Sequence, residues 1–191
     1  MESEVFFMNC NAAEAYRCRY EAILNEMIGK MTNACLNDSL SHNFIVRMIP
    51  HHEAAIEMSR NILCYTRFEP LREIAEGIIS EQTQSIAQMK KALPACEGCR
   101  NTEQERYRYE CEYRRITETM FREMREACTN ANLNASFMRE MIPHHIGAIR
   151  MSRSLLRCPI CGELVPILEA IIASQEKGVC EMRKLLECCE G

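Results

Sequence analysis

The stretch FIVRMIPHH at residues 44–52 returns as FMREMIPHH at residues 137–145, and this repeat decides the fold. A shift of 93 residues superposes the two stretches without a gap, and it continues into MSR at residues 58–60 and 151–153. Upstream, the same shift pairs Tyr16, Cys18, Tyr20, Met27, Met31 and Cys35 with Tyr109, Cys111, Tyr113, Met120, Met124 and Cys128. Because such periodicity indicates a duplicated structural unit, we predict two halves, residues 1–97 and 98–191, that pack as one helical domain.

Each half is predicted to form three helices. In the first half these cover residues 12–36, 41–63 and 70–93, and the first helix of the second half covers residues 105–129. Asn11 and Ser41 are suitable N-terminal caps, and Pro70 suits the first turn of a helix. Runs with the two-residue alternation of strands are missing. The fold class is therefore all-α, and short connections favour an up-down helical bundle built from two gapless three-helix repeats.

Pro50 and its repeat Pro143 fall inside the second helix of each half. A proline there removes one backbone hydrogen bond and is expected to bend the helix just before the His pair. The alternative is a helix that begins at Pro50. The apolar stripe that joins Phe44, Met48 and Met58 across the proline favours one continuous helix.

Composition excludes several classes of protein. The 191 residues carry a formal net charge of −4, which does not favour nucleic-acid binding. No apolar run reaches the roughly 18 residues of a membrane span. The acidic N-terminus lacks the features of a signal peptide, so we expect a cytoplasmic protein, or an exported one if the N-terminus was trimmed. The unusual counts are 13 Met and 13 Cys, both sulfur-containing.

Met and His side chains from three helices are predicted to meet at one level of each half. Met48 lies three residues before His51 and four before His52, so each pair shares a helix face. Adjacent His side chains point about 100° apart, and we expect one to bind tightly and the other to lie nearer the rim. The candidate ligands are Met27, Met31, Met48, His51, His52, Met58 and Met89, with Met120, Met124, Met141, His144, His145, Met151 and Met182 in the second half.

These ligand types predict a soft-metal site. Thioether sulfur favours Cu(I), with Ag(I) as a second candidate and Zn less favoured. Any single Met is as well explained by core packing, but four buried His without partners would be costly to desolvate. Glu-x-x-His and His-Glu-x-x-His motifs and phosphate-binding loops are missing, so we predict no enzyme activity. The predicted function is copper buffering or tolerance, with the metal ion as partner and oligomeric state and any copper chaperone left open.

The cysteines support competing interpretations. Two bridges per half would fit the predicted layout, Cys35–Cys96 with Cys18–Cys64 and Cys128–Cys189 with Cys111–Cys158, in a disulfide-stapled structural or interaction protein without metal function. Reduced thiols would instead be further Cu(I) ligands. A third interpretation is a thiol redox protein that uses Cys158 and Cys161.

The doubled string MIPHHxxAIxMS, followed by IIxxQ and a distal Met, resembles the DUF305 family. The resemblance covers about residues 41–93 and 134–186. It implies a duplicated ferritin-like bundle, copper-binding relatives of the CopM type, and a four-helix core made by the second and third helices of both halves. It marks Met48, His51, His52, Met58, Gln82 and Met89, with Met141, His144, His145, Met151, Gln175 and Met182. Ser41 and Asn134 stand where many relatives have an acidic residue, and the cysteine content is unusual for the family.

Overall fold

The computed structural model describes the backbone of residues 2–127 and 132–190 and the side chains of 12–127 and 132–188. Over these residues the chain forms six α-helices, one short 3-10 helix (η1) and no strand, which confirms the all-α class. The elements are α1 (Glu2–Thr32), α2 (Leu40–Leu63), α3 (Glu69–Glu97), α4 (Glu103–Glu126), α5 (Leu133–Leu155), η1 (Gly162–Leu164) and α6 (Val165–Glu190).

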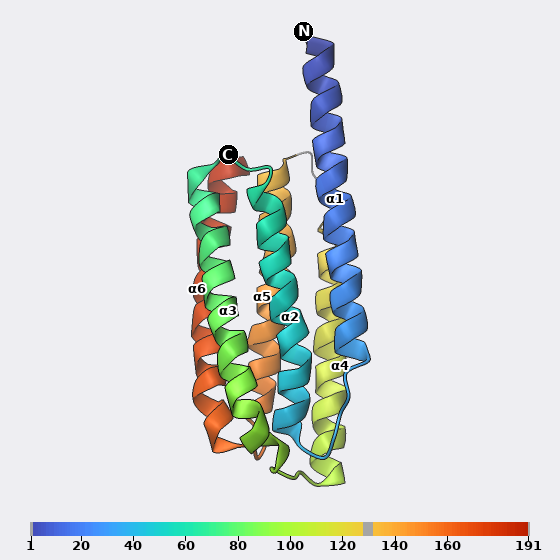
Figure 1. The fold of residues 1–191 in the computed structure, drawn as a ribbon, viewed down its shortest axis with the longest axis vertical. Helices are drawn as coiled ribbons and strands as arrows, with labels where there is room; N and C mark the ends of the chain where they lie inside the picture. The colour runs from blue at the N-terminus through green and yellow to red at the C-terminus, as the bar shows by residue number, and fades with distance from the viewer. Residues whose placement is uncertain (1, 128–131, 191) are drawn as a thin grey trace.

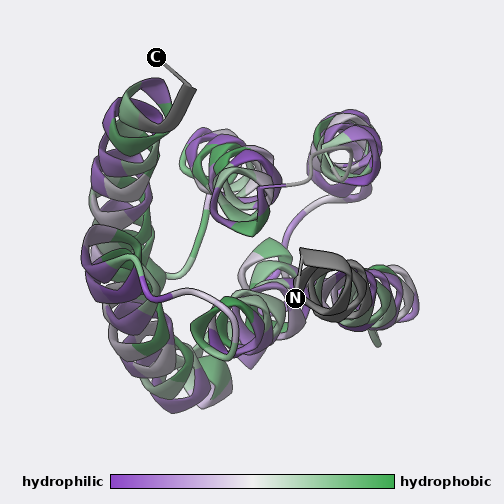
Figure 2. Cartoon of the chain, turned by 90° about the horizontal axis from the view of Figure 1, so that it is seen from above, coloured by the Kyte–Doolittle hydropathy of each residue, from purple (hydrophilic) through white to green (hydrophobic). Residues whose placement is uncertain are grey.

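Successive helices run in opposite directions, so the predicted up-down order is confirmed (Figure 1). The helices α2, α3, α5 and α6 form a four-helix core, in which α2 contacts α3 and α5 while α6 contacts α3 and α5. On the outside, α1 packs against α2 and α4 packs against α5. Viewed along the bundle, each helix carries both hydrophobic and hydrophilic residues, as amphipathic helices do (Figure 2). The narrower ferritin-like assignment stays a prediction.

Several predicted helix ends are wrong. The first helix begins at Glu2, so residue 11 lies inside it and is not a cap. Ser39, not Ser41, caps α2 by accepting a hydrogen bond from the backbone N–H of His42. Ser41 is buried and accepts a hydrogen bond from the N–H of Cys161 at 2.9 Å, which ties the start of α2 to the α5–α6 connection.

Pro50 and Pro143 lie inside α2 and α5, so each helix is continuous through its proline. The alternative of a helix that begins at Pro50 is therefore wrong, whereas the predicted bend stays a prediction. The continuity matters for the site, because it places His51 and His52 at mid-helix on a rigid element and not at a fraying end.

Contacts between the halves involve charged and polar side chains. The Arg47 guanidinium donates two hydrogen bonds to the Glu110 carboxylate, at 2.8 and 2.9 Å. The Tyr16 hydroxyl donates to Glu140 at 2.5 Å. Residues 47 and 140 are equivalent in the repeat, so the two halves meet through matching positions with different chemistry. The boundary between residues 97 and 98 stays a prediction.

Within the described part of the chain, no helix combines the length and the hydropathy that a membrane span requires.

Candidate metal centre

Four imidazole rings lie where α2 and α5 pass each other in opposite directions. The rings of His51 and His144 stack, with centroids 3.7 Å apart and planes 28° from parallel. Each has its chain neighbour, His52 or His145, at 5.9 Å. All four residues are at most 2% exposed. The prediction that one His of each pair binds tightly and the other lies nearer the rim stays a prediction.

Most of the ring nitrogens make no hydrogen bond of normal geometry within the described residues. Nε2 of His144 lies 3.1 Å from the backbone oxygen of His51, and Nε2 of His52 lies 3.0 Å from the Ser85 hydroxyl. Because a carbonyl oxygen only accepts, Nε2 of His144 must carry the proton, which leaves a lone pair on its Nδ1. That Nδ1, both nitrogens of His51 and the Nδ1 atoms of His52 and His145 are buried and unpartnered.

Burial keeps these rings neutral. Desolvation lowers the pKa of His52 to about 3 and that of His144 to about 4. The pKa values of His51 and His145 are also well below the usual value, first through desolvation and then through the proximity of the other imidazoles. Neutral imidazole is the form that binds metal ions, so the lone pairs are available at neutral pH.

The unpartnered polar atoms recur in both halves. Besides the imidazoles, the buried hydroxyls of Ser59 and Ser152 have no partner among the described residues. The same holds for Oε1 of Gln82 and of Gln175. Both pairs are related by the 93-residue shift. Because isolated buried polar atoms cost free energy, their repetition indicates a built feature of the core and not a local accident.

All ten Met residues proposed as ligands are buried, so the structure confirms their place in the core. Met27 lines a pocket of about 60 Å³ between α1 and α2, together with Pro50 and Ala54 and with exposed charged side chains such as Lys30. In the second half, the sulfur of Met120 lies 2.0 Å from where a Cβ on Gly147 would stand. Positions 54 and 147 are one turn from the first His of each pair, about 4.5 Å along the helix. The ten are Met27, Met31, Met48, Met58, Met89, Met120, Met124, Met141, Met151 and Met182.

No group of three or more His, Cys, Asp or Glu side chains with the geometry of a metal site is found in residues 12–127 and 132–188. A site at the stacked imidazoles would therefore combine His nitrogen with thioether sulfur. Cu(I) accepts such a donor set at low coordination number, whereas Zn prefers four ligands drawn from thiolate, imidazole and carboxylate groups.

The disulfides of the alternative interpretation are not formed where the structure describes them. The cysteines of the proposed Cys18–Cys64, Cys35–Cys96 and Cys111–Cys158 bridges are all free thiols. The fourth proposed bridge, Cys128–Cys189, lies outside the residues whose side chains are described. Burial also raises the pKa of Cys158, which argues against the redox interpretation.

Sequence reasoning missed a cluster formed by Cys96, Cys99 and Cys161, where the end of α3 meets the α5–α6 connection. The thiol of Cys161 lies beside those of Cys96 and Cys99, and burial followed by this contact raises the pKa of Cys96 to about 12. Asn101 donates to the carbonyl of Pro159 at 2.8 Å and holds the same two segments together. The Cys-x-x-Cys spacing of residues 96–99 was visible in the sequence, but its partner in the other half was not.

Alkylation of the native, unreduced protein with iodoacetamide at pH 8 is expected to separate the thiols. Cys18 and Cys35 are exposed and should react quickly. Cys96 should react slowly, because a pKa of about 12 instead of 9.0 lowers its thiolate fraction roughly a thousandfold. Site-resolved mass spectrometry over time measures the rates. Equal rates at Cys18 and Cys96 would contradict the burial, and an unreactive Cys35 would restore the disulfide interpretation.

Comparison with known proteins agrees with this architecture. The model of the family described as "Domain of unknown function (DUF305)" matches residues 21–93 and 41–186. Among solved structures, the chain is similar to a DUF305 fragment from Deinococcus radiodurans, with a TM-score of 0.56 and 21% identity, over 77% of this chain and 95% of that one. No curated protein matches the chain. The family match spans most of the sequence and both copies of the repeat, and the chain belongs to the DUF305 family.

Proposed function

We propose that the protein binds Cu(I), with Ag(I) as an alternative ion, in the core between α2 and α5, and that it serves copper buffering or tolerance and not catalysis. The observation that carries the proposal is the set of four buried, neutral imidazoles, five of whose ring nitrogens lack partners among the described residues. Thioethers of Met27 and Met120 lie against the same turns of α2 and α5 and would supply the soft donors.

The physical argument concerns the cost of leaving these nitrogens unpartnered. Each buried polar group without a hydrogen bond destabilises a fold by about 1–3 kcal/mol. A bound ion would offset this cost by accepting the lone pairs of His51 and His144. Because both ligand types are neutral, the site would select by softness and size, which favours monovalent Cu(I) over Zn(II).

The test is anaerobic Cu(I) titration of the reduced protein against a chromophoric Cu(I) chelator, with elemental analysis of the product. We expect H51L/H144L to weaken Cu(I) binding by about 100-fold or more, because it removes both central ligands. M27L/M120L should weaken binding while keeping the volume of the core, which isolates the role of sulfur. H42Q is the matched control, because His42 lies in the first turn of α2, away from the stacked rings.

A stability measurement distinguishes binding from a packing role. Leu at positions 51 and 144 removes unpartnered polar atoms, so metal-free H51L/H144L is expected to unfold at the same temperature as wild type or higher. Wild-type protein that takes up no Cu(I), or an H51L/H144L variant that binds it with wild-type affinity, would refute the proposal.

A further inference from the structure

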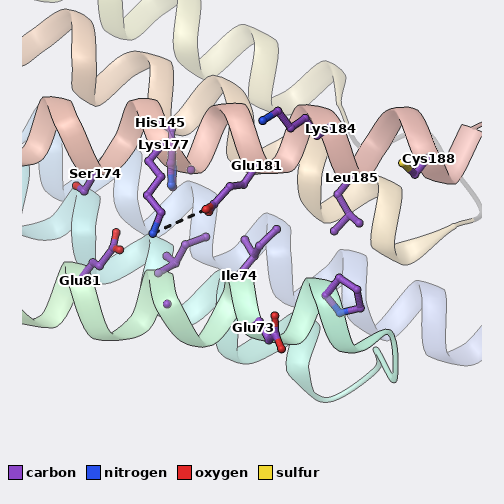
Figure 3. Close-up of a pocket in the computed structure, with 14 residues that line it drawn as sticks. Glu73, Ile74, Glu81, His145, Ser174, Lys177, Glu181, Lys184, Leu185 and Cys188 are labelled. Atoms are coloured by element: carbon purple, nitrogen blue, oxygen red, sulfur yellow. Dashed lines mark ion pairs between the residues drawn. The ribbon is translucent and has the colours of Figure 1, made fainter.

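A groove between α3 and α6 leads from the surface to one of the four imidazoles. Its volume is about 530 Å³, and its walls include Gly77 and Glu81 from α3 and Lys177 and Gly178 from α6. His145, which belongs to α5, forms part of its floor. In Figure 3 the His145 ring lies behind Lys177 and points between the two helices. Although His145 is only 2% exposed, its remaining exposure is toward this groove.

The repeat-equivalent groove is smaller, about 280 Å³, and its described lining, which includes Gln88, Ala92 and Ile167, does not reach His52. His52 is the repeat equivalent of His145, and its Nε2 is covered by the hydroxyl of Ser85 at 3.0 Å. The equivalent of Ser85 is Gly178. A Cβ at Gly178 would stand 2.9 Å from Cδ2 and 3.0 Å from Nε2 of His145. The missing side chain thus leaves Nε2 of His145 uncovered and without a hydrogen bond to the described residues.

We propose that metal ions enter and leave the bundle through this groove, and that Nε2 of His145 is the first of the four buried imidazoles that they meet. The inference rests on the proposed function. On this proposal, ions exchange at the second half of the site, through His145. The first half is closed, because Nε2 of His52 is held by Ser85.

The side chains at the mouth suit a route that opens easily. Lys177 and Glu181 pair across one turn of α6 at 3.8 Å, with side chains 66% and 46% exposed (Figure 3). An exposed pair of this kind contributes little and is screened by salt, so Lys177 is free to swing aside. The charged groups that line the groove are three carboxylates and two ammonium groups, of Glu73, Glu81, Glu181, Lys177 and Lys184. Their summed charge is not positive, so the groove does not repel a cation.

The first arm of the test measures access without metal. Diethyl pyrocarbonate acylates neutral imidazole, and mass spectrometry locates the product. In wild type we expect modification of His145 and of the partly exposed His42, with His51, His52 and His144 protected. G178S should protect His145, and S85G should expose His52. G29S, which adds the same group on α1 outside the groove, where no atom lies within 4 Å, should change nothing.

The second arm measures the rate of Cu(I) transfer from a chelator by stopped flow. G178S is expected to slow transfer at least about tenfold while the number of ions bound stays the same, because access then requires local opening of the helices. G29S should transfer at the wild-type rate. Circular dichroism checks that each variant is folded. S85G complements G178S, because it uncovers His52 by removing a side chain and does not add one.

The outcomes separate the two proposals. Protection of His145 while His42 is modified, or a wild-type transfer rate in a folded G178S variant, would overturn the entry route and leave Cu(I) binding intact. Absence of Cu(I) uptake by wild type would overturn the proposed function and the entry route together, while the labelling pattern would still report whether His145 is accessible.

Discussion

Metal-free protein is expected to lose stability steeply below pH 6.5 and to unfold between about pH 5.5 and pH 3.5. Burial lowers the pKa of all four central His residues below the ordinary value of 6.5, to about 3 for His52 and about 4 for His144. Between these values and 6.5 the unfolded chain binds protons that the native protein does not. Stability is therefore fully present above pH 6.5 and is lost as the pH falls.

The expected effect is large because four groups act together. Each protonation contributes about 1.4 kcal/mol per pH unit, so four His residues together lower the free energy of unfolding by about 5 kcal/mol per unit below pH 6. A domain of ordinary stability has about 5–15 kcal/mol in total. One to three pH units are then enough to unfold it.

Circular dichroism and urea denaturation across the pH range measure the transition. H42Q should leave the midpoint unchanged, whereas H51L/H144L should shift it to lower pH by removing two of the titrating groups. Cu(I) should also shift it to lower pH, because metal and proton compete for the same lone pairs. A metal-free protein equally stable at pH 7 and pH 5 would show that the imidazoles are not buried as neutral groups.

Much of this arrangement could be predicted from the sequence, because it depends on periodicity. The 93-residue repeat gave the number and order of the helices, and the unbroken stripe from Phe44 to Met58 predicted a helix that continues through Pro50. The burial of His51 also followed from that stripe. Periodicity shows which face of a helix is apolar, and that information is enough to predict these features.

The features that could not be predicted depend on contacts between distant segments. Ser39 and Ser41 are equally suitable caps by composition, and the choice is made by Cys161, which uses the hydroxyl of Ser41. The choice between disulfides and thiols could not be made for the same reason, since the thiol beside Cys96 belongs to the other half. The open side of the imidazole cluster follows from Gly178 in place of Ser85, and this difference gains meaning only once the His ring is seen beside it.

The second large effect is expected at the contact between α2 and α4. The Arg47 side chain is 6% exposed, and both of its terminal nitrogens donate hydrogen bonds to Glu110. Its guanidinium carbon lies 4.1 Å from the centroid of the Tyr113 ring. E110A leaves this charge buried with only the aromatic face as partner. We expect the free energy of unfolding to fall by about 3 kcal/mol, at the lower end for a broken buried pair because Glu110 itself is partly exposed.

Removing the other partner should cost less, and this asymmetry is the sharper test. R47M leaves Glu110 able to turn to water and keeps the volume that Arg47 fills, so we expect a loss of about 1 kcal/mol. The double variant R47M/E110A should be more stable than E110A alone, because no buried charge remains.

On the same helix, Glu112 pairs with the exposed Arg157 at 3.3 Å, and E112A should cost less than about 1 kcal/mol. Urea denaturation of the metal-free variants at pH 7 measures all four. Equal losses for E110A and E112A would mean that Arg47 reaches solvent, and that the contact between the halves does not depend on this ion pair.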